Sequence, residues 1–271
     1  MQYEPIKRSL GRFFAGSLFL RKTLYFLLDL LLLRTWHVKK ALRKIARQFP
    51  GEASVLDAGA GFGQYTWSMS KMNIRWNIKA IDINVEQTED CSRFFAKAGL
   101  SDRVTFLQED LTTLSDKECY DIILSVDVME HIEKDVLVFT NFFKSLKDNG
   151  VLIISTPSDQ GGSNVHDAEG SFIDEHVRPG YSIREITEKL NMAGFRKVAA
   201  VYTYGRSGNI SWRLSIYYPV RMLNISYLFF IILPFYYLIF FPVSVILNII
   251  DLNMTHRTGT GLLVTARKQS R

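Results

Sequence analysis

Three glycines at alternate positions follow a carboxylate in the first quarter of the chain. The acid is Asp57, and the glycines are Gly59, Gly61 and Gly63. Apolar residues precede the acid, so the segment reads as a buried strand, a glycine turn and a helix that opens at Gln64. Glycine is needed where the backbone turns sharply or approaches a ligand closely, because a Cβ would clash there. Such a turn lies at the carboxyl edge of an open α/β sheet, where small ligands bind.

The spacing and charge of this turn favour one kind of ligand. A dinucleotide-binding turn has the form G-x-G-x-x-G and holds a pyrophosphate at the helix N-terminus. Here the spacing is G-x-G-x-G, and Asp57 would repel a pyrophosphate. The pattern therefore predicts a ligand that carries cationic groups and no phosphate, such as S-adenosylmethionine. A glycine turn without a ligand is the alternative that the motif alone leaves open.

The motif resembles the first motif, D-x-G-x-G-x-G, of the class I S-adenosylmethionine-dependent methyltransferases. A second match is the Glu130-His131 pair after the fourth predicted strand. A glycine turn, an apolar strand and a proline over 150–157 are typical of the type 11 and quinone-pathway branch. The resemblance covers roughly residues 36–204 and 258–268. It implies a Rossmann-like α/β fold, in which a seven-stranded sheet has helices on both faces and strand seven is antiparallel.

The resemblance also implies roles for residues at the ends of the predicted strands. Asp82 would accept the ribose hydroxyls, as an acid at the tip of strand two can. Asp110 would accept from the adenine amino group, with Leu111 against the ring. The backbone at Val126 would lie against the cofactor, and Asp127 would begin the loop that faces the methyl group. The predicted cofactor-binding residues are thus Asp57, Gly59, Gly61, Gly63, Asp82, Ile83, Asp110, Leu111, Val126 and Asp127.

Two histidines are the candidate bases. Methyl transfer from a sulfonium is an in-line displacement that mainly requires alignment, but a phenol or hydroxyl acceptor must also lose a proton. His131 follows strand four, and His176 lies in a long polar loop over 158–180. We expect one of them to be the base, or neither. No metal site is predicted, since neither Cys91 nor Cys119 has the spacing of a metal ligand.

The apolar periodicity predicts alternating strands and helices, with additions at both ends of the chain. The predicted helices are 17–33, 36–48, 64–72, 85–98, 133–147 and 183–193, and the predicted strands are 53–57, 77–81, 104–108, 120–126, 150–156, 195–204 and 259–266. We divide the chain into a helical arm (1–50), a methyltransferase core (51–213), a hydrophobic insert (214–256), and a last strand with its tail (257–271).

The arm carries most of the positive charge. The chain has a net charge of +6, whereas residues 1–50 hold eleven Lys/Arg and two acids and the remainder is net negative. The arm is also rich in Phe and Leu, which fits a membrane surface better than a phosphate backbone. We expect the arm to serve as a lid and a membrane contact, and we expect no nucleic-acid partner.

The insert contains 29 uncharged residues from Met222 to Ile250. One crossing of a bilayer would leave strands six and seven on opposite sides, and two crossings need about 40 apolar residues. The sequence therefore predicts a helical hairpin beside the active site that dips into one leaflet, with Pro234 or Pro242 near its bend. Tyrosines flank the insert, as suits an interface. A helical pair packed against the arm, or in a dimer, is the alternative.

Together these features predict a methyltransferase acting on a lipophilic, membrane-associated acceptor, most simply by O-methylation of a phenol, a quinone precursor or a lipid head group. We expect it in the cytoplasm, bound peripherally or monotopically to the inner face of the membrane. The alternatives are a degenerate membrane scaffold with this fold, a methyltransferase of a soluble molecule or RNA, and a nucleotide-linked oxidoreductase, which the spacing disfavours. No oligomeric state follows from the sequence.

Overall fold

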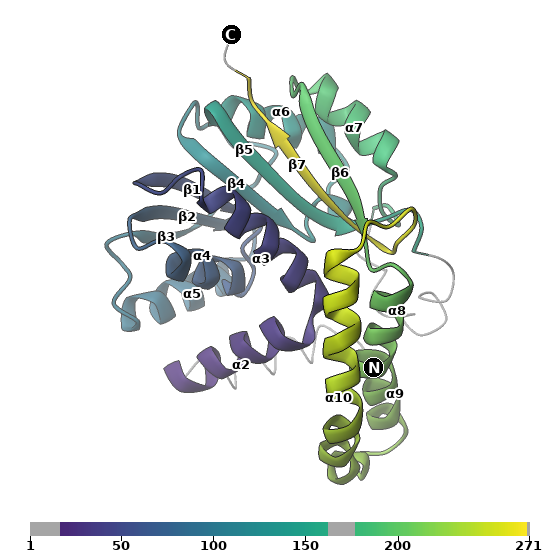
Figure 1. Ribbon diagram of the computed structural model, residues 1–271. Coiled ribbons are helices and arrows are strands. Elements are labelled where there is room, and N and C mark those ends of the chain that lie inside the picture. The colour runs from purple at the N-terminus through teal and green to yellow at the C-terminus, as the bar shows by residue number, and fades with distance from the viewer. Residues whose placement is uncertain (1–16, 162–176, 270–271) are drawn as a thin grey trace.

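A twisted seven-stranded sheet forms the centre of the molecule, with strand order β3-β2-β1-β4-β5-β7-β6 (Figure 1). The strands are β1 (Ala53–Ala58), β2 (Trp76–Asp82), β3 (Val104–Gln108), β4 (Tyr120–Val126), β5 (Leu146–Pro157), β6 (Lys197–Thr203) and β7 (Gly261–Arg267). β7 pairs antiparallel with both β5 and β6, whereas β1 to β5 pair in parallel. The predicted fold class is confirmed.

Helices cover both faces of the sheet in this computed structural model, which describes residues 17–161 and 177–269. The helices of the arm and core are α2 (Leu18–Leu31), α3 (Leu33–Ala46), α4 (Gln64–Met72), α5 (Val85–Lys97), the 3₁₀ turn η1 (Met129–His131), α6 (Asp135–Ser145) and α7 (Ile183–Met192). α6 and α7 pack on one face of the sheet. α2 to α5 pack on the other face.

The predicted elements agree with the structure except at a few boundaries. The two predicted arm helices are α2 and α3, and they meet at Leu32, which has extended backbone. The helix predicted to end at 147 ends at Ser145, because β5 begins at Leu146 rather than at 150. Leu146 is fully buried and pairs with Tyr120 of β4, so its tertiary contacts override the local helical pattern.

The insert between β6 and β7 folds as a helical hairpin, which we define as residues 206–253 (Figure 1). Its first arm consists of α8 (Arg206–Trp212), a π-helical segment η2 (Arg213–Tyr217) and α9 (Tyr218–Ile225), and its second arm is α10 (Phe229–Asn253). Because β6 is parallel to β1 and β4, the hairpin leaves the sheet at the same carboxyl edge as the glycine turn. The hairpin therefore leaves the sheet at the carboxyl edge, as predicted.

The predicted bend at a proline is wrong. Pro234 and Pro242 both lie inside α10, and the chain turns at 226–228. Ser226 has extended backbone, and its hydroxyl accepts a hydrogen bond from the Leu228 amide at 3.2 Å. A serine hydroxyl that accepts from a nearby amide stabilises a turn. A proline inside a helix removes one hydrogen bond and crowds the preceding turn, but α10 continues through both prolines.

Candidate functional site

The glycine turn after β1 has a packed side and an open side. Gly59, Gly61 and Gly63 have φ of +80°, +51° and +75°, which L residues rarely adopt. A Cβ on Gly59 would lie 2.2 Å from Val128, and one on Gly63 would lie 3.1 Å from Phe95. A Cβ on Gly61 would have only Gln87 within reach, at 3.8 Å. A ligand can therefore approach the backbone at Gly61, and the two other glycines allow the turn to pack on the protein.

Asp57 lies under this turn and is 2% exposed. Its Oδ2 accepts a hydrogen bond from the hydroxyl of Thr66 in α4. Burial raises the pKa of Asp57 to about 7, Thr66 opposes that rise, and the nearby charge of Asp82 adds to it. A cationic ligand beside the pair would favour the ionised carboxylate. The charge of the site therefore fits an ammonium or sulfonium group and not a phosphate.

Asp82, at the end of β2, is tied to the same turn. Its Oδ2 accepts from the Gly61 amide at 2.8 Å, and its Oδ1 accepts from the Asn84 amide at 2.9 Å. The amides of Gly59 and Ala60 both donate to the main-chain oxygen of Ile81 at 2.9 Å. The predicted acid of strand two and the predicted glycine turn are thus brought together.

The other predicted contacts lie at neighbouring strand ends. Ile83 is 69% exposed beside Asp82. Asp110 is exposed after β3, and its Oδ1 accepts from the Thr112 amide at 2.8 Å. Leu111 is packed into the core beside it. An apolar side chain and an acid therefore follow β2 and β3, where the adenine of a cofactor would lie.

The loop after β4 completes the edge. Val126 is half-buried at the end of the strand, and Asp127 has a left-handed backbone, with φ of +51°. The amide of Asp127 donates to Ser155 of β5 at 2.8 Å. His131 is exposed at the end of η1. His176, the other predicted base, lies outside the described residues.

Two charged residues near this loop were given no role in the sequence analysis. Arg34 of α3 forms an ion pair with Asp127. Glu130 is 1% exposed and accepts a hydrogen bond from the hydroxyl of Thr156 at 3.0 Å, and burial raises the pKa of its carboxyl group. The Glu-His pair offered a signal for Glu130, but Arg34 looks like an ordinary member of a basic arm.

The arm lies against the glycine turn. Arg21 of α2 is 3% exposed and donates to the main-chain oxygen of Phe62, between Gly61 and Gly63, at 2.9 Å. The hydroxyl of Tyr25 donates to the same oxygen, and Arg21 forms an ion pair with Asp90 of α5. This buried arginine holds α2 against the backbone of the glycine turn.

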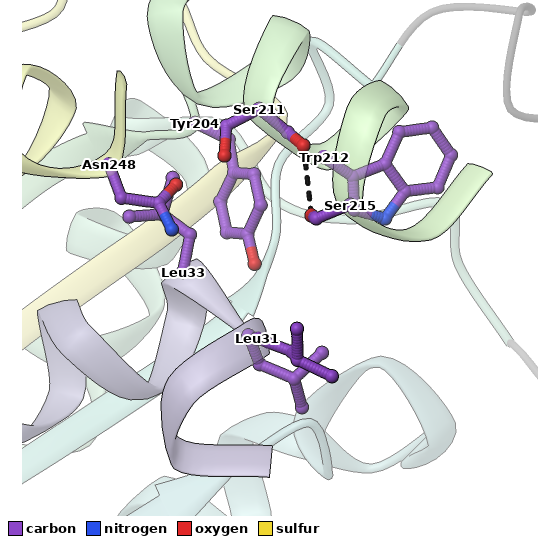
Figure 2. A pocket seen from close by; sticks show the side chains of 8 residues that line it. Leu31, Leu33, Tyr204, Ser211, Trp212, Ser215 and Asn248 are labelled. Atoms are coloured by element: carbon purple, nitrogen blue, oxygen red, sulfur yellow. Dashed lines mark hydrogen bonds between the residues drawn. The ribbon is translucent and has the colours of Figure 1, made fainter. Parts of the chain in front are cut away.

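The hairpin joins the body at a small cavity (Figure 2). The cavity has a volume of about 10 Å³, room for about one water. Its lining comes from the α2–α3 junction, from Tyr204 after β6 and from both arms of the hairpin. The backbone amide of Arg34 donates to the Tyr204 hydroxyl at 2.8 Å. Arg34 therefore links the root of the hairpin to the loop that holds Asp127.

The comparisons with known proteins identify the family. The family model described as a methyltransferase domain matches residues 51–194, more than half of the chain. The chain therefore belongs to this methyltransferase family and has the class I fold, and S-adenosylmethionine is the cofactor of this class.

Curated relatives match over a shorter stretch. The ubiquinone biosynthesis O-methyltransferase of Rickettsia conorii is 28% identical over 102 residues, covering 38% of this chain and 34% of the relative. The mitochondrial protein of the same name from Candida albicans is 27% identical over 104 residues, covering 38% of this chain and 32% of the relative. The chain thus matches about a third of the length of these relatives.

Solved structures share the fold at low sequence identity. Phosphoethanolamine N-methyltransferase 2 of Haemonchus contortus, in complex with S-adenosyl-L-methionine, has a TM-score of 0.61 at 16% identity, covering 86% of this chain and 53% of that one. The [4+2]-cyclase SpnF has a TM-score of 0.55 at 17% identity, covering 82% of this chain and 76% of that one. A fold that carries both a methyltransferase and a cyclase does not by itself name the reaction.

Proposed function

We propose that this protein transfers a methyl group from S-adenosylmethionine to a lipophilic acceptor that it meets at a membrane. The observation that carries the proposal is the position of the hairpin. An apolar hairpin and the glycine turn leave the sheet at the same edge, and Arg34 contacts both Tyr204 at the hairpin root and Asp127 in the loop after β4. An acceptor dissolved in lipid would therefore reach the site without crossing water.

The chain's own residues would bind and orient the reactants. Asp57 and Asp82 supply negative charge and acceptor oxygens below the turn. Gly61 leaves space for the ligand to approach the protein backbone. Asp110, Ile83 and Leu111 would hold the adenine, and Val126 and Asp127 would face the reacting end. Bound S-adenosylmethionine supplies the methyl group on a sulfonium that is already activated.

We infer O-methylation as the reaction, because the relatives that match in sequence are O-methyltransferases by name. A hydroxyl must lose its proton as it attacks, so a base within hydrogen-bond reach would speed the reaction. His131 and His176 remain the candidate bases. Glu130 is a third group nearby whose burial favours the protonated form.

The membrane half of the proposal rests on exposed apolar surface. Among the described residues, α10 is a helix that is both long enough and apolar enough to cross a membrane, and few of its residues are buried. Phe19 and Phe26 of α2 are 76% and 62% exposed as well. Exposed apolar side chains in such number mark an interaction site. A cytoplasmic protein bound to the inner face of the membrane would cover it with lipid.

Calorimetry with S-adenosylmethionine and its demethylated product tests the enzymatic half. We expect saturable binding that is lost in Asp82→Ala and kept in Asp102→Ala, which removes an exposed acid near the opposite end of β3. Absence of binding to the folded protein would favour the scaffold alternative.

Mass spectrometry of lipid extracts from cells with and without the protein tests the acceptor. We expect one lipid class to lose a methyl group when the protein is absent. An unchanged lipid profile, with cofactor binding intact, would favour a soluble acceptor.

A further inference from the structure

The two arms of the hairpin have different outward surfaces. α10 carries no charge from Phe229 to Ile250. Its exposed side chains include Ile231, Leu238 and Ile239, which are 69%, 76% and 65% exposed. These apolar side chains suit acyl chains and not water.

The first arm carries a polar stripe, which we define as Arg206, Asn209, Arg213, Tyr217, Arg221 and Asn224. Its members are three or four residues apart, so they share one face of a helix. All three arginines are exposed. Asp251, the single acid of residues 206–253, is 0% exposed and bonded to His37 at 2.9 Å. The stripe therefore carries net positive charge.

The π-helical segment keeps this stripe in line. A π-helix has more than four residues in each turn, so residues four apart, such as Arg213 and Tyr217, stay on one face. The hydroxyls of Tyr236 and Tyr237 of α10 donate to the main-chain oxygens of Leu214 and Ser215, both at 2.8 Å. Carbonyls in the irregular segment are thus bonded within the protein, as a lipid environment requires.

The stripe distinguishes two ways of entering a bilayer. Ser211 is bonded to Ser244 of α10 at the hairpin root. Ten residues further along the arm, Arg221 lies about 15 Å from that level by the helical rise, which is about half the thickness of the hydrocarbon core. A hairpin that entered tip first would therefore bring Arg221 close to the bilayer centre, where an arginine is strongly unfavourable.

An orientation along the membrane surface satisfies both arms. The arginines can then reach the phosphates of the head groups, and α10 can lie among the acyl chains beneath them. Arg221 donates to the Tyr217 hydroxyl at 3.1 Å and so stays on the stripe. The charge of the stripe is complementary to an anionic leaflet.

We propose that the hairpin lies along the membrane interface, with its polar stripe against the phosphates of anionic lipids and α10 among their acyl chains. The proposal rests on the membrane half of the proposed function and adds the orientation and the lipid class. This orientation replaces the one in which the hairpin dips into one leaflet with its tip foremost.

Depth measurements distinguish the two orientations. In a Cys119→Ser background, whose remaining cysteine Cys91 is buried, a fluorophore is attached at Ile231→Cys, Ile239→Cys or Ile246→Cys. These positions lie on one side of α10 and span about 22 Å along its axis. With vesicles of phosphatidylcholine and phosphatidylglycerol that carry bromine at set depths, we expect all three probes to report the same shallow depth. A steady increase in depth from position 246 to position 231 would overturn the proposal.

Removal of one positive charge is a second test, because the two orientations predict opposite changes in vesicle binding. Arg221→Gln should weaken binding to vesicles containing phosphatidylglycerol about fivefold, by the usual contribution of one surface arginine, and should leave binding to pure phosphatidylcholine almost unchanged. If the tip entered first, Arg221→Gln would strengthen binding instead. The matched control is Arg196→Gln, an exposed arginine before β6 at the opposite edge of the sheet.

The experiments also distinguish failure of the proposed function from failure of the proposed orientation. If the folded protein does not bind either type of vesicle, the membrane half and this proposal fail together, whereas calorimetry with S-adenosylmethionine still reports on the enzymatic half. If the protein sediments as a dimer and the α10 probes are shielded without lipid, a second copy covers α10 and the proposal is wrong.

Discussion

Arg34 in the first turn of α3 forms an ion pair with Asp127, the residue that follows β4. Asp127 holds a left-handed backbone and bonds to Ser155 of β5. The backbone amide of Arg34 donates to the hydroxyl of Tyr204, which lies between β6 and the hairpin. One residue thus connects the N-terminal arm, the loop after β4 and the root of the hairpin.

Replacing this arginine should impair transfer more than stability. The side chains of Arg34 and Asp127 are 35% and 29% exposed, and ion pairs that water reaches contribute little to folding. A small displacement at a reacting centre can nevertheless cost about a hundredfold in rate. We expect Arg34→Gln to slow transfer of labelled methyl groups into lipid extract by roughly ten- to a hundredfold, with little change in melting temperature.

Arg43→Gln, on an exposed position of the same helix, is the control and should transfer normally. Calorimetry should show unchanged cofactor affinity in Arg34→Gln. Equal transfer rates in the two variants would show that the ion pair has no part in positioning the loop.

Asp57 should make the free protein less stable as the pH rises. Its pKa is raised from 3.8 to about 7 in the folded state, so folding favours the protonated form. The cost is absent below pH 4, grows as the pH rises towards 7, and then levels off at no more than about 4 kcal/mol. Asp57→Asn should therefore melt several degrees higher than the wild type at pH 8 and at the same temperature at pH 4.

The same variant should bind S-adenosylmethionine much more weakly, because a neutral amide cannot balance a cationic ligand. Melting curves across this pH range, with and without cofactor, measure both effects. A variant that is less stable than the wild type at pH 8 would show that Asp57 is ionised and well paired in the free protein.

His131 is the candidate base that can be located in the structure. It is exposed on η1, four residues after Asp127, so its replacement should leave the fold intact. If it accepts the proton of the acceptor, His131→Gln should lower the transfer rate by roughly a hundred- to ten-thousandfold and leave cofactor affinity unchanged. Single-turnover transfer from labelled cofactor measures this step. Normal transfer in His131→Gln together with loss in His176→Gln would assign the role to His176.

The glycine turn and the strand ends could be predicted because their signals are local. A run such as Val55–Ala58 identifies a buried central strand, and the residues after each parallel strand must meet at one edge. Asp82 and the glycine turn that follows Asp57 therefore come together as expected, through the bond between Asp82 and the Gly61 amide.

The contacts made by the N-terminal arm could not be predicted in this way. Arg34 and Asp127 are far apart in the sequence and meet only because α3 packs on the sheet against β5 and β7 with its first turn beside the loop after β4. Arg21 looks like a surface cation in the sequence but is buried against Phe62. The turn of the hairpin was misplaced because a proline is a strong local signal, whereas Ser226 acts through a single hydrogen bond.

The two tyrosines that bond to the π-helical segment should determine how firmly the hairpin holds together. Tyr236 and Tyr237 satisfy the carbonyls of Leu214 and Ser215, and an unpaired carbonyl away from water costs about 1–3 kcal/mol. Tyr236→Phe and Tyr237→Phe should each speed hydrogen exchange of the amides of 213–217 in vesicle-bound protein by about tenfold or more. Tyr218→Phe, at a 42% exposed position in α9, is the control. Because the two bonds lie side by side in one segment, the double variant should exchange faster than either single variant. Exchange at the wild-type rate in the double variant would mean that water or lipid head groups reach these carbonyls, so that the phenols are not needed.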